Sequence, residues 1–420
     1  MIKNKNIAII GLGYVGLPLA VEFGKNFPTI GYDVNVNRIQ ELKMGIDKTG
    51  ETSKKSIQSS IKLSFSEKLN NIEKCNIYIV SVPTPIDKNN NPNLKILFNA
   101  TKNIGSILKK NDIVIYESTV YPGCTEDDCV PILEKESGLK YNKDFFCGYS
   151  PERINPGDTK RTLTKIVKIT SGSNPKVAEE IDNLYKSIIT AGTYLAENIK
   201  IAEAAKIIEN CQRDINIAFV NELSILFNKM NLDTNKVLDA ASTKWNFLQF
   251  RPGLVGGHCI GVDPYYLTHK AKKIGYKSKI ILSGRKLNDS IPDLVCNNAL
   301  GFFTGQKLSN LNVLLLGITF KENCSDTRNS KVIEIFNTLN KKGINLTVYD
   351  PFAIKEDVKS EYNIDLIEVN QIRNKFYNII LVCVGHKQFL NLNLNDYIKN
   401  NNSIVYDLKN IYKNKNYLRL

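Results

Sequence analysis

Residues 7–20 of the chain read Ile7-Ala8-Ile9-Ile10-Gly11-Leu12-Gly13-Tyr14-Val15-Gly16-Leu17-Pro18-Leu19-Ala20. A short β-branched run ends at Gly11, three glycines follow in the spacing G-x-G-x-x-G, and a helical pattern then begins. Gly11 allows the tight turn, Gly13 lets the backbone approach a pyrophosphate, and Gly16 permits close packing of helix on strand. The segment therefore predicts a dinucleotide-binding unit whose helix N-terminus faces the phosphates.

A second predicted strand, residues 29–33, ends in Asp33, about 20 residues after the glycines, where a carboxylate accepts hydrogen bonds from the adenosine ribose. Such a carboxylate repels a 2′-phosphate, so NAD is favoured over NADP. We interpret Arg38, which follows closely, as a residue near the adenine or on the surface. Further strands at 76–82 and 112–116 precede Thr84 and Thr119, which are candidate cofactor contacts because ligands lie beyond the carboxyl ends of parallel strands.

The last hundred residues repeat this order of strands. Residues 312–317, 346–350, 378–384 and 403–407 match the four strands in turn, but Gly317-Ile318-Thr319-Phe320-Lys321 replaces the three glycines. A helical pattern over 198–229 connects the copies, and its apolar residues beyond one face fit either a partner subunit or an internal core. We predict an α/β fold of two Rossmann-like, doubly wound parallel-sheet domains joined by a long central helix. The predicted domains are 1–197 for NAD binding, 198–300 for the central helical and dimerisation region with the reactive Cys, and 301–420 for a second nucleotide.

The composition excludes several classes of protein. The 420 residues carry 56 Lys+Arg against 42 Asp+Glu, a net charge of +14, but the lysines are spread along the chain, which indicates a solvated surface rather than a nucleic-acid site. No apolar run approaches the ~18 residues that span a bilayer, and no signal peptide is evident. Nine Cys without a C-x-x-C pair, and only three His, predict reduced thiols, a cytoplasmic location and no metal site.

Two groups of residues are candidates for chemistry. Residues 253–264 place Cys259 among glycines with Asp263 four residues later, and a thiolate in such a setting could trap an aldehyde. Most cysteines are instead small buried hydrophobes, and the residues alone leave the two readings of Cys259 equally open. Lys206 and Asn210 share a helix face, which Arg213 extends, and could stabilise an oxyanion, although this spacing also occurs on exposed faces.

These segments together resemble the UDP-glucose/GDP-mannose dehydrogenase family, almost from end to end. The resemblance rests on the following residues, in the order of the family's motifs: Gly11-Leu12-Gly13-Tyr14-Val15-Gly16, Val82-Pro83-Thr84-Pro85, Glu117-Ser118-Thr119, Ser150-Pro151-Glu152-Arg153, Lys206 with Asn210, Gly257-His258-Cys259, and Phe320-Lys321 with Asp326 and Arg328. It implies a four-electron oxidation of a sugar C6 alcohol to a uronic acid with two NAD+, on a UDP-sugar bound by a homodimer.

The resemblance also implies roles for individual residues. Cys259 would form a thiohemiacetal and then a thioester, with Lys206 and Asn210 stabilising the oxyanion. Asp263 would orient or activate water, and Glu152 would assist hydrolysis of the thioester. Thr119 would lie beside cofactor and substrate, Arg328 would reach the NAD phosphates, and Lys321 would contact the substrate.

The segments around Glu152 and Cys259 resemble the branch of the family that oxidises UDP-N-acetylhexosamines of the glucosamine and galactosamine type. Arg153 and Val262 stand where UDP-glucose enzymes usually have Phe and Lys. Arg153 and His258 could donate hydrogen bonds to an acetamido oxygen, and Arg251 could contact substrate across the dimer. The predicted cofactor contacts are Gly11, Gly13, Tyr14, Val15, Gly16, Asp33, Arg38, Thr84, Thr119 and Arg328, and the predicted substrate contacts are Glu152, Arg153, Lys206, Asn210, Arg213, Arg251, Gly256, His258 and Lys321.

Three alternatives remain at this stage. A UDP-glucose 6-dehydrogenase would share every motif except those that distinguish the acetamido branch. A single-step hydroxyacid dehydrogenase would use the Lys206 and Asn210 pair without needing Cys259. A non-catalytic nucleotide-binding protein would keep both Rossmann halves with an inactive site. The product of the favoured reaction would supply surface polysaccharide synthesis.

Overall fold

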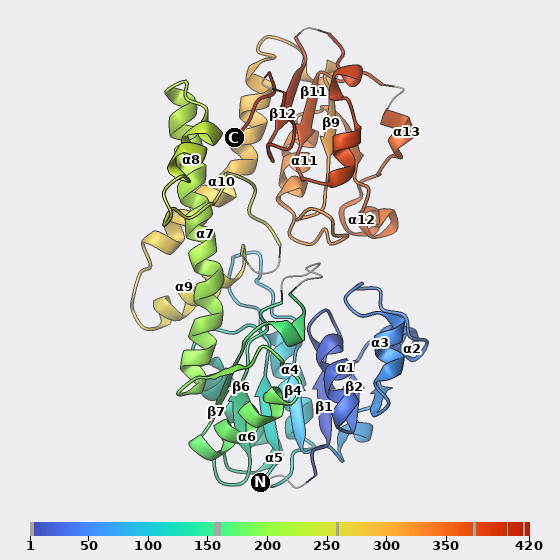
Figure 1. Cartoon of the computed structure of the whole chain (residues 1–420), viewed down its shortest axis with the longest axis vertical. Helices are drawn as coiled ribbons and strands as arrows, with labels where there is room; N and C mark the ends of the chain where they lie inside the picture. The colour runs from blue at the N-terminus through green and yellow to red at the C-terminus, as the bar shows by residue number, and fades with distance from the viewer. Residues whose placement is uncertain (1–3, 155–160, 258–259, 373–374, 401, 415) are drawn as a thin grey trace. The chain divides into compact units, whose positions relative to one another are not determined.

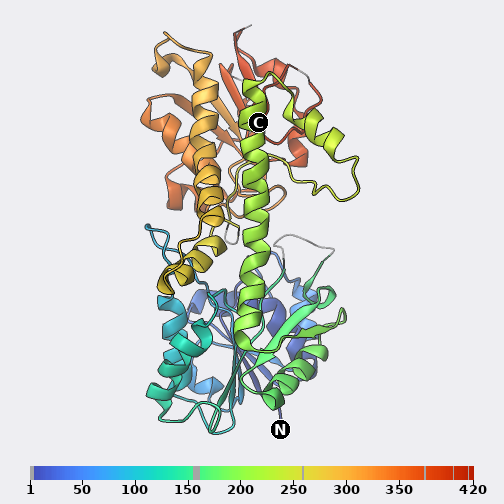
Figure 2. The same ribbon diagram turned by 90° about the vertical axis from the view of Figure 1, so that its left-hand side faces the viewer.

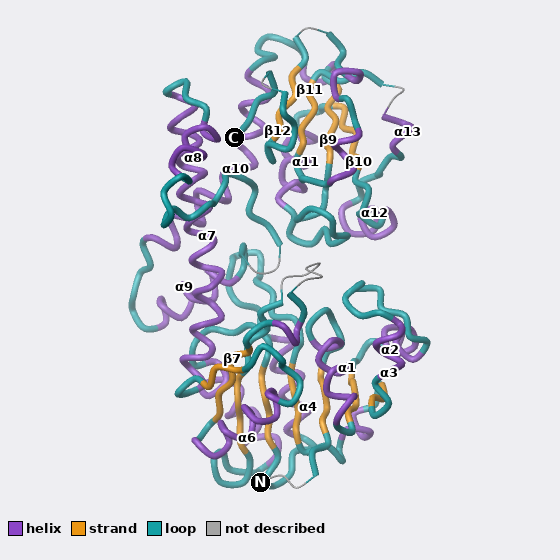
Figure 3. The backbone as a smooth tube through the Cα atoms, in the orientation of Figure 1, coloured by secondary structure: helices purple, strands orange, loops and turns teal. Residues whose placement is uncertain are grey.

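The computed structural model describes residues 4–154, 161–257, 260–372, 375–400, 402–414 and 416–420. The chain forms two compact units, each with a parallel sheet and helices around it (Figure 1; strands are orange in Figure 3). The first unit comprises residues 1–209 and 265–276, and the second comprises 210–264 and 277–420. The predicted central region, residues 198–300, is thus divided between them.

The sheet of the first unit has eight strands in the order β3-β2-β1-β4-β5-β6-β7-β8. Neighbouring strands are parallel except β7, which runs antiparallel to β6. From β3 to β6 this is the strand order of dinucleotide-binding folds, in which ligands lie at the crevice between β1 and β4. The strands are β1 Ile7–Ile10, β2 Thr29–Tyr32, β3 Leu63–Ser66, β4 Ile77–Val80, β5 Ile113–Tyr116, β6 Phe146–Tyr149, β7 Lys168–Gly172 and β8 Thr193–Leu195.

The central strands of this sheet are buried on both faces. Every residue of β1, β4 and β5 is buried, as expected for β-branched runs covered by helices on both sides. Leu17 and Phe23 of α1 join Ile7 and Ile9 of β1 in one core. The helices of this unit are α1 Gly16–Asn26, α2 Val36–Lys43, α3 Lys54–Ser59, α4 Lys95–Gly105, α5 Val130–Ser137 and α6 Pro175–Lys186.

The second unit repeats half of this topology, which confirms the predicted repeat. Its sheet has the order β10-β9-β11-β12, equivalent to β2-β1-β4-β5. The register is also the same: Leu316 pairs with Tyr349 and Val382, as Ile10 pairs with Tyr32 and Val80. The elements are β9 Asn312–Leu316, β10 Asn345–Tyr349, β11 Ile379–Val382, β12 Ile404–Asp407, α11 Lys331–Lys341, α12 Lys355–Tyr362 and α13 Val369–Ile372.

The predicted central helix is confirmed as α7, Ile199–Lys229, which begins in the first unit and continues into the second (Figure 2, green). The remaining helices are α8 Thr234–Ala241, α9 Asp263–Lys273 and α10 Ile280–Gly301. Within the described residues, no helix offers an apolar stretch long enough to cross a lipid bilayer.

Candidate active site

The glycine turn between β1 and α1 has the geometry that the motif predicts. Gly11 has φ +90°, a conformation that favours glycine, and its N–H donates to the Tyr32 carbonyl at 2.9 Å. A Cβ on Gly16 would lie 1.9 Å from the Gly11 carbonyl oxygen, so only glycine permits this packing of α1 on the turn. A Cβ on Gly13 would meet no atom within 4 Å, which leaves the space in front of its backbone open to a ligand. Tyr14 and Val15, which follow it, are half-buried.

Asp33 follows β2 and faces this turn. Its Oδ2 accepts a hydrogen bond from the Leu12 N–H at 2.9 Å, and its Oδ1 accepts one from the Asn35 N–H at 2.9 Å. Arg38 donates from Nε to the Leu12 carbonyl at 3.0 Å and pairs with Asp47 at 2.7 Å. Arg38 therefore stabilises the glycine turn through the Leu12 carbonyl and is not a free surface residue.

A cavity of about 160 Å³ opens beside Asp33 at the carboxyl ends of β1, β2 and β4. Its wall is mainly apolar, as suits an adenine ring, and includes Ile10, Gly11, Tyr32, Asp33, Val34, Val82, Pro83, Ile96, Ala100 and Ile104. The open backbone at Gly13, the carboxylate of Asp33 and this apolar wall fit NAD in its usual position at the switch point of the sheet. Thr84 and Thr119, which follow β4 and β5, are half-buried at the same edge.

Glu152 lies in the loop after β6 and belongs to a buried charged cluster. Its Oε1 accepts hydrogen bonds from the N–H groups of Arg153 and Ile154, and its Oε2 lies 3.6 Å from Nζ of Lys168 on β7. Lys168 also pairs with Oε2 of Glu117 at 2.6 Å, and Tyr185 donates to the other Glu117 oxygen. Sequence reasoning missed Lys168 and named Glu117 only as part of a motif, although a lysine in an otherwise uncharged strand was a visible signal.

Asn210 and Asp263 meet in the second unit. The Asn210 side-chain amide donates to Asp263 Oδ2 at 2.6 Å, and both residues are buried. Lys206, also buried, precedes Asn210 by one turn of α7. The structure thus brings together an amide and a carboxylate that the sequence placed 53 residues apart.

The segment that leads to the predicted nucleophile is held at both ends. At one end, the Asn221 side chain accepts from the Gly253 N–H at 2.8 Å and donates to the Gly253 carbonyl at 3.1 Å. At the other, the Gly257 N–H donates to the Asn329 carbonyl at 3.1 Å. A Cβ on Gly256 would lie 2.5 Å from that same Asn329 oxygen, so the backbones pass in close contact.

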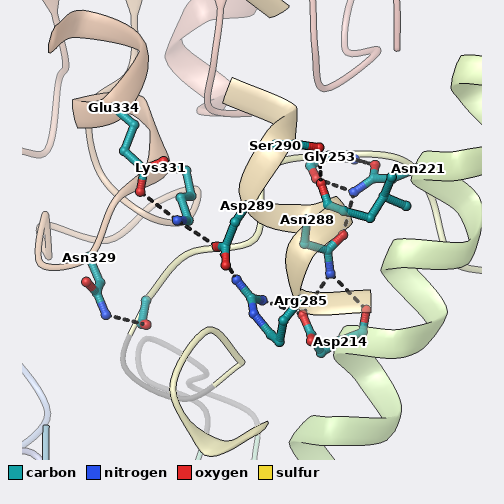
Figure 4. A network of polar contacts seen from close by, with 12 residues as sticks. Asp214, Asn221, Gly253, Arg285, Asn288, Asp289, Ser290, Asn329, Lys331 and Glu334 are labelled. Carbon is teal, nitrogen blue, oxygen red and sulfur yellow. Dashed lines mark hydrogen bonds and ion pairs between the residues drawn. The ribbon is translucent and has the colours of Figure 1, made fainter. Parts of the chain in front are cut away.

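A buried polar network supports Asn221 from α10 (Figure 4). Asn221 donates to Asn288 Oδ1 at 2.9 Å, and Asn288 donates to Asp214 Oδ1 at 2.7 Å. Arg285, which is 2% exposed, pairs with Asp214 at 2.5 Å and also with Asp289. The network continues from Asp289 to Lys331 at the start of α11, at 2.9 Å.

His258 and Cys259 lie outside the described residues. The other thiols are free and mostly buried. Burial raises the pKa of Cys75 to about 11 and the pKa of Cys211 and Cys296 to about 12, so these thiols are protonated at neutral pH and are poor nucleophiles. Across the described part of the chain, no group of three or more His, Cys, Asp or Glu is placed to hold a metal ion.

The turn after β9 carries Lys321 into a small pocket of the second unit. Two more lysines that sequence reasoning missed, Lys331 and Lys409, line the same pocket together with Gly256 and Phe320. Lys321 follows β9, Lys409 follows β12 and Lys331 begins α11, so the three cations line a pocket where a nucleotide phosphate is expected.

The predicted arginines are placed in different ways. Arg153 donates to the Val167 carbonyl at 2.8 Å and pairs with Glu209 at 2.7 Å, so part of its guanidinium is already engaged within the first unit. Arg251 pairs with Asp239 at 2.6 Å. Arg328 forms a bidentate pair with Asp326 on its own loop, and Arg213 is exposed on α7.

Comparison with known proteins covers the whole chain. Models of the UDP-glucose/GDP-mannose dehydrogenase family match residues 5–189 as NAD binding domain, 200–290 as central domain and 314–414 as UDP binding domain. A UDP-N-acetyl-D-glucosamine 6-dehydrogenase of Pseudomonas aeruginosa is 52% identical over 100% of both chains, and one of Salmonella typhi is 52% identical over 97% of this chain and 96% of its own. The solved structure of a UDP-D-ManNAc dehydrogenase from Pyrococcus horikoshii superimposes with a TM-score of 0.87 at 27% identity, covering 99% and 98% of the two chains.

Proposed function

Because the chain belongs to the UDP-glucose/GDP-mannose dehydrogenase family, whose members are NAD-dependent nucleotide-sugar dehydrogenases, we propose that it oxidises the C6 hydroxyl of a UDP-N-acetylhexosamine to the carboxylate. The observation that carries the substrate class is the end-to-end 52% identity with two UDP-N-acetyl-D-glucosamine 6-dehydrogenases. The residues of the candidate site support the reaction type.

The cofactor supplies the hydride acceptor for both oxidations. Gly11, Gly13, Gly16, Asp33 and the apolar cavity beside Asp33 would hold it. The chain's own residues then have to stabilise charge on the sugar, retain the aldehyde and hydrolyse the thioester.

In the proposed mechanism, Cys259 is the residue that retains the aldehyde. Its thiolate sulfur bonds to C6 and gives a thiohemiacetal oxyanion, which Lys206 and Asn210 stabilise by charge and hydrogen bonding. Oxidation of this adduct gives a thioester. Cys211 lies beside Asn210 on α7, but burial raises the pKa of its thiol. This supports Cys259, and not Cys211, as the nucleophile.

Hydrolysis returns the thiol. Water oxygen bonds to the thioester carbon, a water proton passes to the Glu152 carboxylate, and the C–S bond breaks to release the Cys259 thiolate. Asp263, which accepts a hydrogen bond from Asn210, orients that amide and the water. The covalent adduct prevents loss of the aldehyde between the two oxidations.

Several exposed apolar side chains of the second unit support a homodimer. Trp245 is 91% exposed, and Phe219, Leu226, Met230 and Leu248 are each about half exposed on or near α7 and α8. An apolar surface of this kind in an otherwise charged protein fits an interface between two copies. The free thiols fit a reducing cytoplasm, and the uronic acid product fits a role as a precursor of surface polysaccharide.

The test uses purified protein, NAD+ and a panel of UDP-sugars, with NADH counted per sugar consumed. Two NADH per UDP-N-acetylhexosamine, with slower turnover of UDP-glucose, is the expected result. One NADH per substrate would support a single-step dehydrogenase, and binding without NADH would support a nucleotide-binding protein.

A covalent intermediate gives a second test. Cys259→Ser should abolish formation of the acid, because a hydroxyl is a far poorer nucleophile at neutral pH. Glu152→Gln should accumulate a sugar nucleotide acyl adduct on Cys259, visible by intact-protein mass spectrometry. Uronic acid production by Cys259→Ser at a near normal rate would exclude the covalent mechanism.

A further inference from the structure

Lys168 stands between two buried carboxylates of the first unit. Its side chain is 3% exposed, and its Nζ lies 2.6 Å from Glu117 Oε2 and 3.6 Å from Glu152 Oε2. The Tyr185 ring lies 5.5 Å from the same Nζ, and the Tyr185 hydroxyl donates to Glu117. Lys168 is therefore held by Glu117 and Tyr185, and it also lies within ion-pair distance of Glu152.

The buried carboxylate of Glu152 is stabilised by a neighbouring positive charge. Its Oε1 accepts two backbone N–H groups, but its Oε2 is buried and accepts no hydrogen bond. A buried carboxylate oxygen without a donor favours the protonated acid unless a cation stabilises the charge. Lys168 Nζ supplies a positive charge 3.6 Å from this oxygen.

The charge balance of the cluster indicates which carboxyl holds a proton. Burial raises the pKa of Glu117 to about 7, with Glu152 adding to that effect and Lys168 opposing it. One ammonium faces two carboxyls, and the raised pKa of Glu117 favours its protonated form. When Glu117 is protonated, Glu152 is the carboxylate that remains to balance the charge of Lys168.

We propose that Lys168 is a positioning residue for Glu152, whose carboxylate it keeps charged and oriented to accept the water proton during thioester hydrolysis. This inference rests on the proposed function and assigns a residue that acts only in its last step. Glu117 and Tyr185 hold the Lys168 ammonium in place.

The experiment compares Lys168→Met with Lys186→Met in the full-length protein. Lys186 on α6 is a surface lysine paired with Asp182, so its removal controls for loss of one charge. Lys168→Met should form NADH in the first seconds but accumulate the acyl adduct of the natural UDP-sugar, as Glu152→Gln does. Lys186→Met should turn over normally without an adduct.

The pH profile supplies a readout that a merely structural role would not move. A neighbouring cation stabilises the charged form of a carboxyl, so the acid limb of kcat should move to higher pH in Lys168→Met and stay in place in Lys186→Met. The groups that face Glu152 in this cluster are Lys168, Glu117 and Tyr185. Glu117→Gln, which keeps the volume and neutralises the competing carboxyl, should leave the acid limb in place or move it to lower pH.

The outcomes separate this inference from the proposed function. An adduct in Glu152→Gln but none in Lys168→Met, with an unchanged pH profile, would overturn the role of Lys168 alone. Absence of an adduct in Glu152→Gln would count against the hydrolysis step itself. If Lys168→Met does not fold, a strong upward shift of the acid limb in Glu117→Gln would equally overturn the inference.

Discussion

Asp33 and Asp350 occupy equivalent positions in the two Rossmann-like copies, and each carboxylate accepts a hydrogen bond from the backbone just after the first glycine of its turn. Asp33 Oδ2 accepts from the Leu12 N–H at 2.9 Å, and Asp350 Oδ2 accepts from the Ile318 N–H at 2.7 Å. The glycines before them, Gly11 and Gly317, have φ of +90° and +93°.

The two carboxylates nevertheless differ in their burial and in the number of hydrogen bonds that they accept. Asp33 is half-buried beside a cavity, whereas Asp350 is buried and also receives N–H groups from Thr319, Phe352 and Ala353. His386 Nε2 lies 3.1 Å from Asp350 and completes its surroundings. Asp33 therefore remains accessible at the cavity, whereas Asp350 is engaged within the protein, which fits the proposal that Asp33 contacts the ribose of the cofactor.

Removal of the Asp33 carboxylate should weaken the binding of NAD+ and reduce the preference of the protein for NAD+ over NADP+. In Asp33→Ala we expect the KM for NAD+ to rise about tenfold to a hundredfold, the equivalent of ~1.5–3 kcal/mol for a hydrogen bond to a charged group. The measurement is initial NADH formation against concentration of each cofactor. Equal use of NAD+ and NADP+ by the unmodified protein would refute this role.

Asp350→Asn should destabilise the protein without acting on the cofactor. Burial alone would raise the pKa of Asp350, but hydrogen bonds from His386 and the backbone outweigh it and lower the pKa to about 2. The asparagine NH2 would face N–H donors, and the loss should be about 3–5 kcal/mol in urea unfolding at pH 7. An unchanged unfolding midpoint would contradict this expectation.

The lowered pKa of Asp350 also predicts how the stability of the folded protein changes at acid pH. Its folded-state pKa lies below its ordinary value of 3.8, so its contribution is complete above pH 4 and is lost as the pH falls toward 2. The unfolding midpoint of the unmodified protein should therefore fall steeply below pH 4. Asp350→Asn should show a shallower fall over the same range, measured by urea titration at each pH.

Gly13 and Gly16 form a matched pair for the cofactor turn. A Cβ at residue 13 meets no atom within 4 Å, so Gly13→Ala should fold normally but obstruct the pyrophosphate and raise the KM for NAD+. A Cβ at residue 16 would overlap the Gly11 carbonyl at 1.9 Å, so Gly16→Ala should lower the melting temperature as well. Calorimetry with and without NAD+ separates the two effects, and equal stability of both variants would contradict the packing argument.

We expect Asn221 to hold the backbone at Gly253 in place, in the segment that leads to the proposed nucleophile Cys259. Asn221→Ala leaves the buried N–H and carbonyl of Gly253 without their partners, at a cost of about 1–3 kcal/mol for each group. We expect lower stability in urea and a kcat that falls more than substrate affinity. Asn216→Ala, which removes an exposed amide from the same helix, is the control and should change neither.

The sequence predicted those features that are encoded locally. The apolar runs before Gly11 and Gly317 predicted strands, and the helical periodicity of residues 198–229 predicted α7, because each pattern is continuous in the sequence. It did not predict the pairing of Lys168 with Glu117, which are 51 residues apart and meet only because β7 turns back antiparallel beside β6. Nor did it predict Asp47 as the partner of Arg38, because no pattern marks which loop acid reaches a given arginine.

The boundary between the compact units lies inside α7, between Glu209 and Asn210, and it recurs inside α9 between Pro264 and Tyr265. A cut within a helix removes the hydrogen bonds of a whole turn, whereas a cut in a loop removes few. Lys206 and Asn210 stand on either side of the first boundary, and their spacing is the pitch of α7 itself. Chimaeras that combine the cofactor half of one relative with the sugar half of another should therefore inherit α7 and α9 undivided. The expected junctions lie before Ile199 and after Lys273, and a junction inside either helix should lower the stability of the chimaera.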